Sequence, residues 1–199
     1  MRIGILGGSF DPIHNGHIYM ALQAYKGAAL DEVWLMPSNE TPNKIGKMAP
    51  ASDRIQMCEI AAMEYPFLKV SDFELRLDGI SYTYRTISEL HKICADDELF
   101  FIMGADSINY FEKWKNPDII SAYCTILVIN RDDFSNEYLM EKSKMLKEKF
   151  QTNIKLIKCP KKDISSTEIR DNITDSTFCQ ERLPKGVYDY IRSNSLYTI

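Results

Sequence analysis

The sequence predicts an α/β fold in which a mostly parallel sheet carries helices on both faces. Three observations support this prediction. Short apolar segments alternate with segments of helical periodicity along almost the whole chain. Most of the apolar segments stop at a glycine, proline or asparagine, as buried strands do before a turn. No repeat, low-complexity tract or linker divides the 199 residues, so we expect one domain over 1–199.

Six apolar segments are expected to form the strands. The first, RIGIL at residues 2–6, is followed by Gly7 and Gly8, which suit a tight turn. The others are expected at residues 33–37, 68–71, 99–103, 124–130 and 154–157. Ligands of such sheets bind beyond the carboxyl ends of the strands, so functional residues should converge there.

The helices are expected between these strands. The first should run from about Pro12 to Ala29, because proline fits the first turn of a helix. Ser52 is expected to cap a helix that begins at Asp53. Residues 38–52, just before it, are rich in Pro, Asn, Ser and Lys and predict a long, functional loop. Further helices are expected at residues 83–94, 137–150, 167–172 and 187–193.

The composition argues against several classes of protein. A net charge of -4 disfavours a nucleic-acid binder, which usually carries a basic surplus. No apolar run approaches the roughly 18 residues of a membrane span, and the short N-terminal run does not resemble a signal peptide. The five cysteines are scattered without a CxxC pair, so we expect reduced thiols in a cytoplasmic protein.

The stretch GGSFDPIHNGH, residues 7–17, holds two of the three histidines of the chain. Glycines after a strand allow a ligand to approach the backbone, and a helix N-terminus attracts phosphate. His14 and His17 are expected to project from one face of the first helical turns, with Gly16 leaving room between them. Two imidazole donors there would suit a phosphate that gains charge during a reaction.

Two further segments fit a nucleotide site. In DISSTEIR, residues 163–170, either Ser165 or Ser166 is expected to cap a helix whose first turn carries Arg170. Hydroxyls, free N–H groups and a guanidinium suit the outer phosphates of a nucleoside triphosphate. In GADSINYFEKW, Gly104 and Asp106 follow an apolar strand, where a carboxylate suits ribose hydroxyls.

Three further residues are candidates for ligand binding. Trp114 is suited to stacking on a heteroaromatic ring, and the N–H groups of a helix that opens near Thr83 are suited to a carboxylate. Lys44, in the long loop, is placed to reach a phosphate. His91 lies in a predicted helix away from the strand ends and is expected to be structural.

Common nucleotide and metal motifs do not match the first stretch. Its glycines are not spaced as GxGxxG, and no GK[ST] follows as in a P-loop. The HxxH spacing lacks the glutamate and third ligand of a zinc protease. We therefore expect no metal site built from protein side chains.

The two motifs together resemble a known family. GGSFDPIHNGH is similar to the GGxFDPxHxGH signature, and ISSTEIR to the ISSTxIR signature, of the nucleotidylyltransferase superfamily. Within it, SYTYRTISEL, GADSINYFEKW and GVYDYIRSNSLY resemble the bacterial nicotinate mononucleotide adenylyltransferases. The resemblance implies a Rossmann-like, doubly wound fold and the formation of deamido-NAD and pyrophosphate from ATP and nicotinate mononucleotide, with Mg²⁺ arriving on ATP.

The resemblance also implies roles for individual residues. His14, His17 and Arg170 would be catalytic. ATP would be bound by Gly7, Gly8, Ser9, Phe10, His17, Gly104, Asp106, Ser166, Thr167 and Arg170. Nicotinate mononucleotide would be bound by His14, Lys44, Thr83 and Trp114. Two positions depart from the family pattern: Asn43 stands where the loop often has histidine, and Arg85 where an acid is usual.

The same motifs are consistent with other functions. An enzyme of the same superfamily with another acceptor, such as nicotinamide mononucleotide or phosphopantetheine, would carry the same phosphate motifs. A paralogue that binds ATP without turnover is a more distant alternative, and the intact His14, His17 and Arg170 argue against it. The sequence leaves homo-oligomerisation open.

Overall fold

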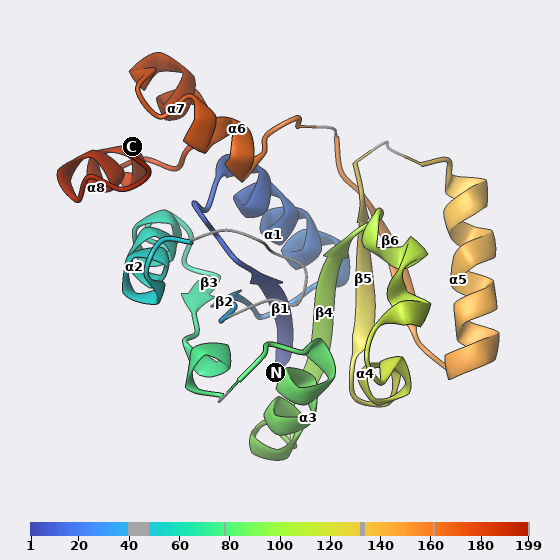
Figure 1. The fold of residues 1–199 in the computed structure, drawn as a ribbon. Coiled ribbons are helices and arrows are strands. Elements are labelled where there is room, and N and C mark those ends of the chain that lie inside the picture. Colours follow the sequence, from blue (N-terminus) through green and yellow to red (C-terminus); the bar gives the residue numbers. More distant parts are fainter. Residues whose placement is uncertain (40–47, 78, 132–133, 161, 199) are drawn as a thin grey trace.

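Six parallel strands form one sheet in the order β3-β2-β1-β4-β5-β6 (Figure 1). The computed structural model describes residues 1–39, 48–77, 79–131, 134–160 and 162–198. The strands are β1 (Arg2–Gly8), β2 (Glu32–Pro37), β3 (Leu68–Val70), β4 (Glu98–Gly104), β5 (Thr125–Asn130) and β6 (Ile154–Lys158). The predicted α/β, Rossmann-like fold is confirmed, and its strand order reverses between β1 and β4, where such folds bind ligands.

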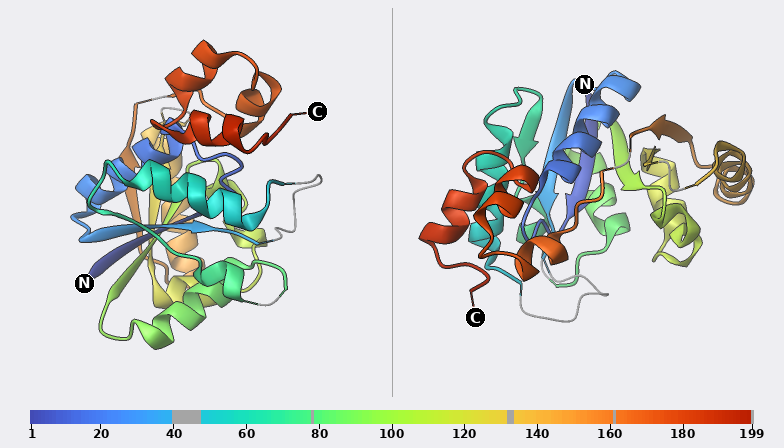
Figure 2. Two further views of the ribbon diagram at one scale, coloured as in Figure 1. Left: turned by 90° about the vertical axis from the view of Figure 1, so that its left-hand side faces the viewer. Right: turned by 90° about the horizontal axis from the view of Figure 1, so that it is seen from above.

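Helices cover both faces of the sheet (Figure 2). One face carries α1 (Asn15–Ala28), α2 (Ala51–Ala62), α6 (Ser166–Asp171), α7 (Ser176–Arg182) and α8 (Val187–Ser193). The other carries α3 (Thr83–Ile93), α4 (Pro117–Tyr123) and α5 (Asn136–Phe150), with short 3-10 turns at Phe73–Arg76, Ser107–Asn109 and Phe111–Lys113. Among the described residues, no helix is long and apolar enough to cross a membrane.

The two hydrophobic clusters follow the alternation of the strands. On β5, Leu127 and Ile129 pack under α1, whereas Ile126 and Val128 pack under α3 to α5. Successive side chains of a strand point to opposite faces, so a strand covered on both sides must be apolar throughout. This explains why the central strands β4 and β5 appear in the sequence as nearly unbroken apolar runs.

Two predicted helix starts were wrong. The first helix begins at Asn15, because His14 is still extended (φ -144°, ψ 168°) and Pro12 lies in the preceding turn. The helix α2 begins at Ala51 with Pro50 as its N-cap, so Ser52 is not a cap. The Pro50 carbonyl accepts the first helical hydrogen bonds, from the N–H groups of Asp53 and Arg54, both at 3.1 Å.

Two helices escaped prediction, and one strand is longer than expected. The strand β1 continues through Gly7 and Gly8, which pair with β2 instead of forming the turn. The helix α4 starts with Pro117 in its first turn, a recognisable signal. The helix α7 is capped by the Asp175 side chain, which accepts from the N–H of Phe178 at 3.0 Å.

We expect Leu127→Ala to lower the free energy of unfolding by about 2–5 kcal/mol, because it opens a cavity in the core between the sheet and α1. Leu127 has no exposed surface. The matched control is Met140→Ala on α5, where the side chain is 65% exposed and the expected change is within about 0.5 kcal/mol. Urea unfolding followed by circular dichroism measures both, and equal changes would contradict this packing.

Candidate active site

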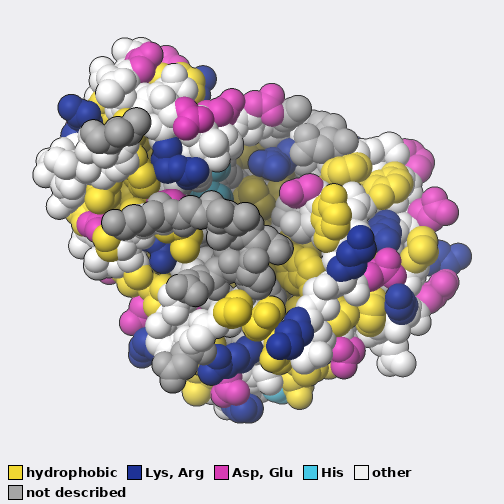
Figure 3. All heavy atoms as spheres, viewed as in Figure 1, with side chains coloured by type: hydrophobic (Ala, Val, Ile, Leu, Met, Phe, Trp, Pro, Cys, Tyr) yellow, Lys and Arg dark blue, Asp and Glu magenta, His cyan; other side chains and the backbone are white. Residues whose placement is uncertain are grey.

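Three connected hollows lie at the carboxyl edge of the sheet. The central one, of about 430 Å³, lies between β1, β4, α1 and the start of α6. A second, of about 210 Å³, shares Gly7, Phe101 and Trp114 with it and extends toward α3. A third, of about 440 Å³, shares Arg131 and the start of α6 with it. Figure 3 shows histidine in this depression, with Lys or Arg side chains beside it.

His14 and His17 lie together at the N-terminus of α1. Their rings are stacked, with centroids 3.7 Å apart and planes inclined by 24°. The backbone N–H of His14 donates to Nδ1 of His17 at 3.2 Å. Because Nδ1 accepts this bond, the proton of neutral His17 is on Nε2. The pair thus places a defined N–H donor at a helix N-terminus, where anions are favoured.

His14 is held neutral by its surroundings. It is 5% exposed, and this burial lowers its pKa to about 4, with a smaller contribution from the positive charge of Arg131. Gly16 has a spatial role here, because a Cβ at that position would lie 2.9 Å from Nδ1 of His14. The expected role of Gly16 is therefore extended: it makes room for the His14 ring itself.

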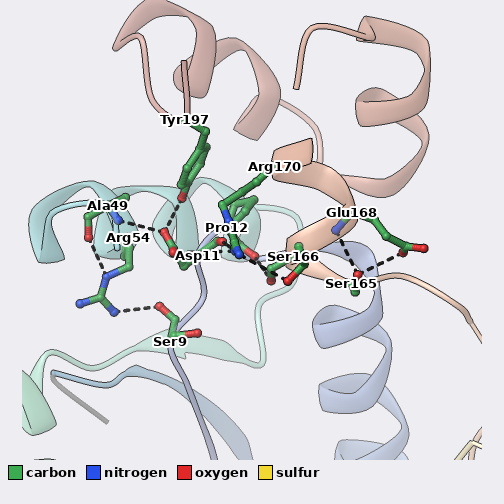
Figure 4. Close-up of polar contacts among 11 residues, drawn as sticks. Ser9, Asp11, Pro12, Ala49, Arg54, Ser165, Ser166, Glu168, Arg170 and Tyr197 are labelled. Carbon is green, nitrogen blue, oxygen red and sulfur yellow. Dashed lines mark hydrogen bonds and ion pairs between the residues drawn. The ribbon is translucent and has the colours of Figure 1, made fainter. Parts of the chain in front are cut away.

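A buried network fixes the loop that precedes the histidines (Figure 4). The carboxylate of Asp11, 4% exposed, accepts from the N–H of Ala49 at 3.0 Å and from the Tyr197 hydroxyl at 2.8 Å. Arg54 reaches across from α2 and donates to the carbonyls of Ser9 and Ser38, both at 2.8 Å. These bonds satisfy most of the polar groups that the loop buries.

The ring of Phe10 also supports the histidines. Phe10 is 1% exposed and meets His17 edge-on at 5.0 Å, with a left-handed backbone (φ 45°). Its side chain belongs to the core and packs against the His17 ring. Gly8 permits this arrangement, because a Cβ there would lie 3.2 Å from the Phe10 ring.

The helix α6 docks directly on the histidine loop. Ser165 is its N-cap and accepts from the N–H of Glu168 at 3.2 Å, which settles the choice between Ser165 and Ser166. The Ser166 hydroxyl donates to the carbonyl of Pro12 at 2.9 Å. Arg170 donates to the carbonyl of Asp11 at 2.6 Å and lies 3.8 Å from its carboxylate. Hydrogen bonds from residues 163–170 therefore hold residues 7–17 in place.

The end of β4 provides a carboxylate at the central hollow. Gly104 closes the strand and Asp106 follows it, and both line the hollow with the histidines. A Cβ on Gly104 would lie 2.5 Å from Oδ1 of Asp106, so a side chain there would displace this carboxylate. Arg131, just after β5, faces the same hollow from the other side.

The second hollow combines an aromatic wall with the start of α3. Thr83 opens α3, and Trp114 packs edge-on against Phe101 with centroids 5.9 Å apart. Glu74 lies on its floor and accepts from the Thr86 hydroxyl at 3.1 Å. Burial raises the pKa of Glu74, while hydrogen bonds from Thr86 and Ser81 act in the opposite direction. The hollow suits a flat ring with a polar substituent.

The structure brings most of the predicted site residues to one edge. Gly7, His14, His17, Trp114 and the start of α6 line the central hollow, and Thr83 lines the second. Lys44 and Asn43 fall outside the described residues. His91 stacks on Tyr123 at 4.3 Å, far from the site, as expected of a structural residue.

Sequence reasoning missed several residues of the site. Arg131 was recognisable, because it follows an apolar strand that ends at the ligand edge. Asp11 stood inside the first motif, but its burial depends on donors from distant segments. Arg54 and Tyr197 were not identified, because Arg54 bonds to Ser9 across 45 residues and Tyr197 to Asp11 across 186 residues.

These features can bind and polarise a phosphate. A helix N-terminus, a neutral imidazole pair and the guanidinium of Arg131 surround one hollow. Among the residues that the structure describes, no group of three His, Cys, Asp or Glu side chains is arranged to hold a metal ion.

Comparisons with known proteins agree with this architecture. The probable nicotinate-nucleotide adenylyltransferase of Clostridium botulinum (strain Eklund 17B) is 38% identical over 98% of both chains. That of Clostridium acetobutylicum is 35% identical over 97% of both. The nicotinic acid mononucleotide adenylyltransferase of Plasmodium falciparum complexed with NaAD shares the fold, with a TM-score of 0.81 at 22% identity over 98% of this chain and 97% of that one.

The family model described as cytidylyltransferase-like matches residues 5–172. This range includes both histidines and the whole of α6, the two parts that meet at the central hollow. The chain therefore belongs to the cytidylyltransferase-like family, and within it to the group of the nicotinate-nucleotide adenylyltransferases.

Proposed function

We propose that residues 1–199 act as a single nucleotidylyltransferase domain that transfers an adenylyl group from ATP to nicotinate mononucleotide, giving deamido-NAD and pyrophosphate. The observation that carries this proposal is the stacked His14–His17 pair at the start of α1, facing the start of α6 across one hollow. The names of the relatives support the choice of substrates. The reaction belongs to the biosynthesis of NAD.

The chemistry needs little from the protein beyond positioning. The second pKa of a phosphate monoester is about 6, so the mononucleotide phosphate is largely ionised at neutral pH and needs no general base. One of its oxygens attacks the α-phosphorus of ATP and forms the new P–O bond. The bond from the α-phosphorus to the bridging oxygen breaks, and pyrophosphate leaves with that electron pair. Catalysis then rests on alignment and on donors for the developing charge.

The central hollow suits ATP. His17 would donate from Nε2 to the reacting phosphate, and the start of α6 with Arg170 and Thr167 would face the outer phosphates. Gly104 and Asp106 would meet the ribose, and Gly7 lines the same hollow, whereas Gly8 and Ser9 line the second hollow. Mg²⁺ would enter on the phosphates of ATP and retain water ligands, in keeping with the absence of a side-chain cage among the described residues.

The second hollow suits the acceptor. Trp114 would lie against the pyridine ring, and the first N–H groups of α3 near Thr83 would bind the carboxylate. His14, which lines the central hollow, would face the phosphate of the mononucleotide. Arg85 lies in the first turn of α3, so its positive charge is near the end of the helix that would hold the carboxylate.

The thiols of the chain suit a reducing compartment. Four of the five cysteines are buried: Cys58, Cys124, Cys159 and Cys179. Burial raises the pKa of Cys124 to about 12, so its thiol is unreactive at neutral pH. We infer a cytoplasmic location for the enzyme.

The proposed activity predicts release of pyrophosphate from ATP-Mg²⁺ with nicotinate mononucleotide in strong excess over nicotinamide mononucleotide at equal concentrations. The reason is the start of α3, whose N–H groups favour a carboxylate over a neutral amide. A coupled pyrophosphate assay with both acceptors, and with phosphopantetheine, measures this. Comparable rates with the first two would indicate dual specificity, and no release with nicotinate mononucleotide would overturn the proposal.

His17→Ala should lower kcat by about 10²–10³-fold, as expected for loss of one donor to the transition state. His91→Ala is the matched control, because His91 only stacks on Tyr123 outside the site and its loss should leave kcat within about twofold. The same pyrophosphate assay compares the two variants, and near-wild-type turnover of His17→Ala would remove His17 from the mechanism.

The neutral state of His14 predicts a dependence of stability on pH. Its pKa is lowered from 6.5 to about 4 on folding, so at pH 5 the unfolded chain binds a proton that the folded chain does not. Stability from this source is present above pH 6.5 and is lost as the pH falls toward 4. Between pH 7 and pH 5 the wild type should lose roughly 2 kcal/mol more than His14→Gln. Equal losses in urea unfolding would show that His14 is not held neutral.

A further inference from the structure

The segment after α8 returns to the histidine loop. Beyond Asn194 the chain turns sharply, with left-handed backbones at Ser195 (φ 50°) and Tyr197 (φ 63°). The N–H of Leu196 bonds to the carbonyl of Ile191 at 3.0 Å, and the side chains of Leu196 and Tyr197 pack against the hydrophobic cluster under α1. This geometry points the Tyr197 ring at the loop before α1 (Figure 4).

Tyr197 ends on a carboxylate that is otherwise enclosed. Its hydroxyl donates to Oδ1 of Asp11 at 2.8 Å, across 186 residues of sequence. Burial, together with the negative charge of Asp11, raises the pKa of Tyr197, so the hydroxyl keeps its proton and remains a donor at physiological pH. The family model matches residues 5–172, so it includes Asp11 but not Tyr197.

Asp11 connects this contact to the parts of the site that would touch phosphate. Its carbonyl accepts from Arg170, and its carboxylate also accepts from Ala49, where the chain enters α2. It stands three residues before His14 in the turn that leads into α1. A shift of Asp11 would therefore move the histidine pair and Arg170 together.

We propose that Tyr197 is a positioning residue for the adenylyl transfer: its hydroxyl fixes Asp11 and thereby sets the orientation of His14, His17 and Arg170. This inference rests on the proposed function for its kinetic consequence. The contact itself predicts a local effect on the loop that does not depend on turnover. We call residues 194–198 the latch, because they hold the loop before α1 in place through this hydrogen bond.

The chain offers a closely matched control. Tyr190, on α8, donates its hydroxyl to Oδ1 of Asp53 on α2, also at 2.8 Å. Tyr190→Phe and Tyr197→Phe both remove one tyrosine–aspartate hydrogen bond between the C-terminal segment and the remainder of the protein. Of these two tyrosines, only Tyr197 bonds to the loop that leads into the histidine pair. A general loss of stability would affect both variants alike.

Tyr197→Phe should lower kcat by about 10–100-fold, as a small misplacement of catalytic groups does, with little change in the KM of nicotinate mononucleotide. Tyr190→Phe should leave kcat within about twofold. Both are assayed where circular dichroism shows them fully folded. In the Asp11→Asn background, Tyr197→Phe should cost less than about twofold, because the two residues act through one bond. Unchanged kcat in Tyr197→Phe would contradict the proposal that Tyr197 positions the histidine pair and Arg170.

Hydrogen exchange measured by mass spectrometry tests the latch without turnover. Backbone amides of residues 9–17 should exchange about tenfold faster in Tyr197→Phe than in the wild type, and at the wild-type rate in Tyr190→Phe. Equal exchange in all three proteins would overturn the proposal, whatever the kinetics. If the wild type fails to release pyrophosphate, the proposed function is wrong, and the exchange rates still decide the latch.

Discussion

The buried carboxylate of Asp11 is the interaction on which the arrangement of the site depends. A carboxylate that is 4% exposed is costly unless hydrogen bonds replace its water. Its partners come from three separate segments: Ala49 before α2, Arg170 on α6 and Tyr197 after α8. The loop before α1 therefore takes its shape only when these segments have docked, and formation of the phosphate site is coupled to completion of the fold.

The sheet determines where this loop lies. The strands β1 and β4 are neighbours although almost a hundred residues separate them, and the chain leaves them toward opposite faces. Their carboxyl ends therefore border an open crevice, into which the N-terminus of α1 points. Trp114 lines both the histidine hollow and the hollow at α3, so one residue borders the proposed places of both substrates. The topology thus places the proposed sites of the two substrates next to each other.

Local pattern and long-range packing explain which features the sequence could predict. The central strands were anticipated because they are buried on both faces and must be apolar, and the histidines and a capping serine at Ser165 or Ser166 because short motifs place them at helix starts. The start of α2 was misplaced because Pro50 and the contacts of Arg54 outweigh the capping preference of Ser52. Arg54 and Tyr197 were missed because their partners lie in other segments. Long-range hydrogen bonds of this kind have no periodicity to detect.

The charge state of the histidine pair follows from its geometry. Two imidazolium ions at a centroid separation of 3.7 Å would repel each other strongly, and burial together with Arg131 already disfavours a charge on His14. A neutral pair still donates hydrogen bonds, so it stabilises charge that develops during reaction more than it stabilises a resting anion. Arg131 lines the same hollow and supplies a positive charge beside this neutral pair.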